Sequence, residues 1–133
     1  MAADVVFVVD NGMDIITDLL LATPIVAVGP HWIDWGTDAT VATATDEAMG
    51  TPGGEARAVG VSTQVTTTVG NDTLQVVGTL TEAGGGATIV ECGLFNSLAG
   101  VAGFMFLHAT FDAINLVDTN SIEFTIKTKF DQG

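Results

Sequence analysis

Apolar residues recur at every second position over several stretches of the chain, a pattern typical of β-strands with one buried face. The C-terminal stretch shows it most clearly, because Ile122, Phe124 and Ile126 alternate with polar and charged residues. The N-terminal VVFVV run is β-branched, ends at Asn11-Gly12, and also favours a strand. The predicted strands cover residues Val5–Val9, His31–Gly36, Arg57–Val69, Thr73–Thr81, Ala87–Phe95, Gly103–Phe111 and Ser121–Phe130.

One segment has helical rather than alternating spacing. Within Met13–Ala22, four aliphatic residues fall on one face of a helix: Ile15, Ile16, Leu19 and Leu20. Asn11 precedes this segment and is a suitable N-cap, with Asp14 close to the positive end of the helix dipole. The pattern therefore predicts one short N-terminal helix.

The remaining segments carry turn and loop signals. Thr37–Gly54 is rich in Ala, Thr, Asp and Gly without a usable period, and predicts a long loop. Gly70-Asn71-Asp72 predicts the turn of a β-hairpin, and Gly84–Gly86 predicts a break between strands. Many short strands, glycine-rich turns and one helix indicate a mainly β protein. We expect an antiparallel β-sandwich or small barrel, formed as a single domain over residues 1–133.

The charge balance changes the range of partners that we expect. The chain has sixteen acidic residues and only three basic ones, Arg57, Lys127 and Lys129, so the formal net charge is −13. Nucleic acids and anionic membranes would be repelled by such a surface, and neither is expected as a partner. The N-terminus lacks the basic region of a signal peptide, and no apolar run approaches the ~20 residues of a membrane span, which predicts synthesis in a reducing cytoplasm. The lone Cys92 lies in an apolar strand and predicts a buried thiol.

Glu91 interrupts an apolar strand in the stretch TIVECGLFN, where alternation places it on the face of Ile89 and Phe95. An unpaired buried carboxylate costs several kcal/mol or takes up a proton. Arg57 is the only arginine, and it begins a predicted strand with valines on the same face. We therefore predict a structural pair between Arg57 and Glu91. The alternative, Glu91 as a general acid, requires a second catalytic group that the sequence does not reveal.

Catalytic and ligand-binding motifs were not found. The chain has no G-x-S-x-G, Walker, H-E-x-x-H or C-x-x-C motif, so we expect no enzymatic activity, no catalytic residue and no cofactor. The spacing of His31 and His108 does not support a metal site. Trp32 and Trp35 suggest a carbohydrate-stacking platform, but alternation places them on opposite faces of one strand. A core anchor and an interface aromatic are the preferred interpretation of this pair.

The order of several motifs resembles a known group of proteins. IITDLLLATP is followed by W-x-x-W-G-T, E-A-R, G-T-L-T, T-I-V-E-C-G-L-F-N and F-L-H-A-T-F. This order resembles small structural proteins of tailed bacteriophages, in particular the tail-collar fibre attachment domain and short proteins labelled as tail-fibre proteins. The most specific part is E-x-G-L-F at Glu91, Gly93, Leu94 and Phe95. The resemblance implies a packing motif and a virion context, while the absence of heptads or collagen-like triplets argues against a fibre shaft.

Three functions follow as expectations. The first is a capsid decoration or cement protein on the outer head surface, binding the major capsid protein and self-associating, in a trimer if it follows local threefold symmetry. The second is a tail component, such as a fibre-attachment adaptor, collar or baseplate protein. The third is a carbohydrate-binding module. The predicted contact segments are Ala2–Val9 and the Thr37–Gly54 loop, and the predicted interface residues are Val5, Phe7, Trp32, Trp35, Thr45 and Met49.

Overall fold

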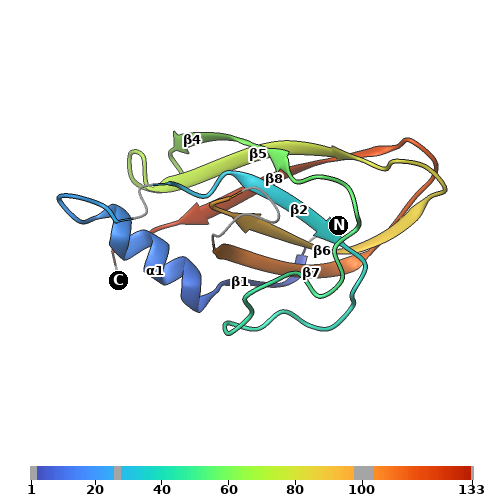
Figure 1. Ribbon diagram of the computed structural model, residues 1–133. Helices are drawn as coiled ribbons and strands as arrows, with labels where there is room; N and C mark the ends of the chain where they lie inside the picture. The colour runs from blue at the N-terminus through green and yellow to red at the C-terminus, as the bar shows by residue number, and fades with distance from the viewer. Residues whose placement is uncertain (1–2, 26–27, 98–103, 133) are drawn as a thin grey trace.

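The computed structural model describes residues 3–25, 28–97 and 104–132. Within these residues eight strands form two antiparallel sheets, which confirms the predicted mainly β class and gives a sandwich rather than a closed barrel. The larger sheet has the order β1-β7-β6-β2-β3 and the smaller sheet has the order β4-β5-β8. In Figure 1 the two sheets lie one above the other, with the helix α1 at one end of the sandwich. No helix in the described ranges has the length and apolar character needed to cross a membrane.

Most strands begin and end close to the predicted positions. Their bounds are β1 Ala3–Val8, β2 Trp32–Gly36, β3 Ala58–Val59, β4 Val61–Val65, β5 Thr73–Thr81, β6 Ala87–Phe95, β7 Met105–Leu116 and β8 Ser121–Lys129. The hairpin of β4 and β5 turns at Asn71, whose φ of 59° is the left-handed conformation that Asn tolerates. Ala2 and Gly103, the first residues of two predicted segments, lie outside the described residues.

The long strand predicted from Arg57 to Val69 is wrong. The chain breaks at the buried Gly60 and passes from β3 in the larger sheet to β4 in the smaller one. A Cβ atom at Gly60 would press against the side chain of Val76 and the carbonyl oxygen of His31, so only glycine fits this crossing. The predicted valine face is consequently exposed, with Val59 at 61% and Val61 at 68%.

The helix α1 spans Asp10–Leu19 and begins earlier than predicted. Its N-cap is Val9, without a side-chain hydrogen bond, so the predicted cap Asn11 instead lies within the first turn. Ile15 is buried in the main core, and Gly12 lets the helix approach the carbonyl oxygen of Phe106 on β7. The helix is therefore held by packing against the sandwich.

The core lies between the two sheets. It is built from aliphatic and aromatic side chains that alternate inward, including Ile33, Trp35, Val76, Leu80, Ile89, Leu94, Phe106 and Ile126. A second, smaller cluster lies on the opposite face of the larger sheet, where Met49 of the long loop packs with Val9, Phe95 and Met105. The larger sheet is therefore covered on both faces, by the smaller sheet on one and by part of the loop on the other.

Candidate functional site: a buried carboxylate that anchors the 37–54 loop

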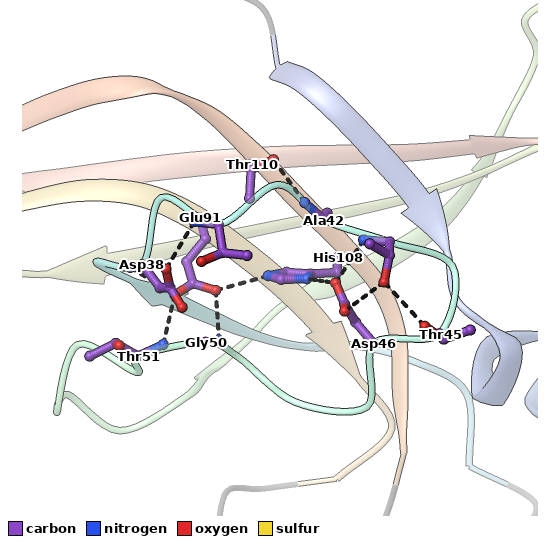
Figure 2. Close-up of polar contacts among 11 residues, drawn as sticks. Asp38, Ala42, Thr45, Asp46, Gly50, Thr51, Glu91, His108 and Thr110 are labelled. Atoms are coloured by element: carbon purple, nitrogen blue, oxygen red, sulfur yellow. Dashed lines mark hydrogen bonds and ion pairs between the residues drawn. The ribbon is translucent and has the colours of Figure 1, made fainter.

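Glu91 is the centre of the most elaborate polar network in the described residues. It lies on β6, is fully buried, and points away from the smaller sheet into the loop of residues 37–54. Its Oε1 accepts hydrogen bonds from the backbone N–H of Gly50 at 2.9 Å, and its Oε2 accepts from those of Asp38 and Thr51 at 3.0 and 2.9 Å. Three backbone donors from both ends of the loop therefore converge on one carboxylate (Figure 2).

His108 supplies the fourth contact to Glu91. It lies on the neighbouring strand β7 opposite Gly93, which makes it a diagonal neighbour of Glu91. Its Nε2 is 2.8 Å from Oε1 of Glu91, and its Nδ1 is 2.7 Å from Oδ2 of Asp46 in the loop. Each ring nitrogen of His108 therefore lies within hydrogen-bond distance of a carboxylate oxygen. The histidine thus links the sheet to the middle of the loop.

Asp46 is held in place by its own local bonds. Burial disfavours its charge, but the backbone N–H of Thr43 and the ring of His108 outweigh this, and the pKa of Asp46 is lowered from its usual value. The Thr43 N–H and hydroxyl donate to the two carboxylate oxygens, both at 2.8 Å. The ionised form of Asp46 is therefore the one that the loop conformation favours.

Further contacts complete the attachment of the loop. The Ala42 N–H donates to Oγ1 of Thr110 on β7 at 3.2 Å, and the Asp10 N–H donates to the carbonyl oxygen of Ala44 at 2.8 Å. Gly36 and Gly93 provide the space, because a Cβ atom at Gly36 would meet the Glu91 carboxylate and one at Gly93 would meet the Met49 sulfur. The loop, which the sequence predicts correctly, is thus a fixed part of the domain.

The predicted pair between Arg57 and Glu91 is wrong. Arg57 instead lies 3.4 Å from Asp34 through Nε, donates to the carbonyl oxygen of Ser97 at 2.9 Å, and stacks 3.5 Å above the ring of Phe95. The sheet order gives the reason: β3 pairs with β2 in a register that brings the residue before Ala58 beside Asp34, one strand away from β6. Burial, partly offset by Trp35 N–H and Arg57, raises the pKa of Asp34.

The facing of β6 also differs from the prediction. An irregular register with β7 occurs between Ile89 and Glu91, and Ile89 packs in the core between the sheets with Cys92 and Leu94. Glu91 therefore does not share a face with Ile89, although Phe95 remains on the loop side. Cys92 is buried as predicted, and burial raises the pKa of its thiol to about 12.

The predicted interface residues differ in how exposed their side chains are. Trp35 has no exposed surface and Met49 is 7% exposed, so neither can contact a partner, because both are packed within the domain. Trp35 is therefore also excluded from a sugar-stacking platform. Phe7 is 40% exposed and Thr45 is exposed, while Val5 and Trp32 are half-buried. Phe7 and Thr45 are the most accessible members, and Val5 and Trp32 are partly accessible.

The geometry of the network is suited to anchoring. Both ring nitrogens of His108 are engaged by carboxylates, so neither is free to take a proton from a substrate. Every buried side-chain nitrogen and oxygen in the described ranges has a hydrogen-bond partner, and these ranges contain no group of three or more potential metal ligands. His31 contacts the carbonyl oxygen of Gly29 instead.

Sequence reasoning identified Glu91 as an acid that needs partners but missed His108 and Asp46. The available signal was a second polar residue inside an apolar strand, the histidine of F-L-H-A-T-F. Two such residues on neighbouring strands indicate a shared polar contact. No protein-family model, no curated protein and no solved structure matches this chain.

Proposed function

We propose that this chain is a non-enzymatic structural protein of a tailed-phage virion, which decorates the outer surface of the head and stabilises the junctions between capsid subunits. The observation that carries the proposal is the role of the E-C-G-L-F motif, the part of the sequence that most resembles such proteins. Glu91 of that motif anchors a long loop through backbone bonds, and Gly93 makes room for the loop. The motif therefore serves to shape a surface.

That surface has a definite location. Phe7 on β1 lies opposite His108, which contacts Asp46 of the loop, so the edge strand β1 and the loop adjoin on the outer face of the larger sheet. Phe7 and Val41 are large apolar side chains exposed at 40% and 59%, and Thr45, in the same loop as Val41, is exposed too. Apolar anchors surrounded by polar loop residues suit a protein partner. We assign capsid contact to this face.

The charge of the chain supports the same location. A net charge of −13 disfavours contact with packaged DNA and is compatible with the outside of a particle. A protein that binds only assembled capsid stabilises that assembly by mass action. The polypeptide can perform this task by shape and contact, without turnover of a substrate.

The test is the copy number and position of the protein in purified particles of the parent phage. Decoration predicts hundreds of copies, seen on the head by particle imaging, and heads that release DNA at a lower temperature when the protein is absent. The variant Phe7→Asp should lose head binding, whereas Val117→Asp, in an exposed position between β7 and β8, should retain it.

A few copies at the tail would contradict decoration and support the second candidate, a tail adaptor, collar or baseplate component. The resemblance to collar-fibre attachment domains favours that candidate. Absence from the particle would contradict both. Binding in a glycan screen that is lost in Trp32→Ala would support the carbohydrate-binding alternative, which now depends on the half-buried Trp32 alone.

A further inference from the structure

The smaller sheet leaves part of the larger sheet uncovered. The larger sheet projects past β8 at β7 and β1, whereas β8 is the last strand of the order β4-β5-β8. Val6 on β1 lies opposite Ala109, a core residue, and so faces the side of the smaller sheet. Nevertheless Val6 is 49% exposed. The inner side of β1 and of the adjoining part of β7 therefore has no strand above it in the described part of the chain.

An apolar groove of about 350 Å³ lies in this position, a volume within the range of about 300–1,000 Å³ that is usual for binding sites. Its lining comes from the larger sheet and from β8, and it includes Val6, Phe111, Ile114, Ile122, Phe124 and Ile126. The part contributed by β8 is continuous from Ile122 to Lys127, so at ~3.4 Å per residue the groove follows this strand for about 17 Å. A long apolar groove beside a strand suits an extended chain better than a compact molecule.

The strand β8 also offers backbone partners to such a chain. Among the described residues it pairs only with β5, so its other edge is open. An open edge presents a row of backbone N–H and C=O groups to an incoming strand. A strand that pairs with this edge places every second side chain over the groove, because side chains alternate between the two faces of a sheet.

We propose that the groove binds an extended segment of a partner protein, which adds to β8 as the fourth strand of the smaller sheet. The segment pairs antiparallel, as both existing pairs of that sheet do. Its apolar side chains cover Val6, and its backbone satisfies the open edge of β8. A second copy of this chain cannot supply its own β8, because the larger sheets of both copies project past β8 and would occupy the same space.

The outer side of β8 specifies the charges of the partner segment. Glu123 and Lys127 are exposed, lie four residues apart, and form no ion pair among the described residues. Opposite charges are favoured at directly opposite positions of paired strands, and like charges are disfavoured. The segment therefore carries an acidic residue opposite Lys127 and, four residues later, a basic residue opposite Glu123. The residues beside these two charges, opposite Ile126 and Phe124, are apolar.

This inference goes beyond the proposed function and does not depend on it. The groove lies on the inner side of the larger sheet, whereas the proposed capsid contact lies on its outer face. The test needs only the purified chain and a fluorescently labelled heptapeptide, V-E-V-T-L-K-I, which has the required pattern. We expect saturable binding by fluorescence anisotropy. The matched control is V-K-V-T-L-E-I, which has the same composition but places like charges opposite each other, and it should bind about tenfold more weakly.

Variants of the chain locate the site and test the charge pattern. The double variant Glu123→Lys/Lys127→Glu should reverse the preference, so that it binds V-K-V-T-L-E-I about tenfold more tightly than V-E-V-T-L-K-I. Val6→Asp places a carboxylate in the apolar groove and should weaken binding by at least about tenfold. Val61→Asp is its control, because it makes the same change at an exposed position of β4, the other edge of the smaller sheet. Melting curves check that each variant is folded.

Hydrogen exchange identifies the strand that is paired. Addition of V-E-V-T-L-K-I should increase the protection of amides in β8 and leave those of β4 unchanged. Absence of binding up to about 1 mM peptide would overturn the proposal. Equal binding of the two peptides, a folded double variant whose preference does not reverse, or a loss of binding in Val61→Asp rather than Val6→Asp would also overturn it. Self-association of the chain that Val6→Asp abolishes would identify a second copy as the occupant and exclude the proposed partner segment.

Discussion

Removing the carboxylate of Glu91 is the sharpest test of the loop anchor. Glu91→Ala leaves the backbone N–H groups of Asp38, Gly50 and Thr51 without their acceptor and leaves Nε2 of His108 without a partner. The side chain is fully buried, so a methyl group in its place leaves a polar cavity at the junction of loop and sheet. We expect the loop to detach before the sandwich unfolds.

The magnitude follows from the number and kind of the broken bonds. Hydrogen bonds to a charged group contribute about 1.5–3 kcal/mol each, and four of them would approach the whole stability of a typical domain. That simple addition overestimates the effect, because folding also removes the carboxylate from water and water can enter the cavity of the variant. Loss of one partner from a buried charged pair costs about 3–5 kcal/mol, which is our expectation for Glu91→Ala.

The assay is urea unfolding followed by circular dichroism, with hydrogen exchange of the loop amides measured in parallel. For a chain of this length the expected loss corresponds to a fall in melting temperature of about 10–20 °C. The amides of Asp38, Gly50 and Thr51 should lose their protection from exchange. Glu47→Ala is the control, because Glu47 is an exposed acid of the same loop and its removal should change stability by less than about 0.5 kcal/mol.

A small effect would refute the reasoning. If Glu91→Ala destabilises the protein by no more than the Glu47 control, the four contacts do not hold the loop. If the stability falls but the loop amides remain protected, the carboxylate supports the sheet and other contacts fix the loop.

Three further perturbations test other parts of the structure. Arg57→Ala should cost about 2–4 kcal/mol in urea unfolding, because it strands the buried Asp34 and removes a stacked cation; an unchanged unfolding midpoint would contradict that pairing. Gly93→Ala should cost about 1–3 kcal/mol by overpacking the loop-facing cluster, whereas Gly70→Ala, with open space around its Cβ, should be nearly neutral. Backbone N–H groups, that of Val69 foremost, hold the pKa of Asp72 below its usual 3.8, so the stability that Asp72 contributes is present above about pH 4 and is lost as the pH falls. Asp72→Asn should therefore reduce the fall in melting temperature between neutral and acidic pH. An unchanged fall in the variant would contradict this role of Asp72.

Local patterns predicted the parts of the fold that depend on neighbouring residues. Apolar patterning located Thr73–Thr81 and Ala87–Phe95 with the bounds that the structure has, because each strand is an apolar stretch bounded by turn residues. It failed at Gly60, because the alternation continues through the point where the chain crosses from one sheet to the other. Contacts with His31 and Val76 require glycine at that crossing, and these residues are distant in sequence, so a local pattern does not indicate them.

The candidate site was likewise predicted where it depends on local sequence and missed where it depends on distant residues. A carboxylate within an apolar strand correctly indicated that Glu91 must be satisfied by partners. The choice of Arg57 as its partner was wrong, because the pairing of β3 with β2 directs that cation to Asp34. The true partners include backbone N–H groups, which every non-proline residue possesses and which therefore leave no mark in the sequence.

This last property has an evolutionary consequence. Glu91 recognises the main chain of the loop at positions 38, 50 and 51 rather than the side chains found there. Substitutions at positions 38 and 51 keep the backbone donor unless they introduce proline, which lacks it, whereas a Cβ atom at Gly50 would press against the side chain of Asp38. Exposed loop positions such as Val41 and Glu47 are likewise free to drift. The same scaffold can in this way carry different side chains on the loop surface while the acid beneath it stays the same.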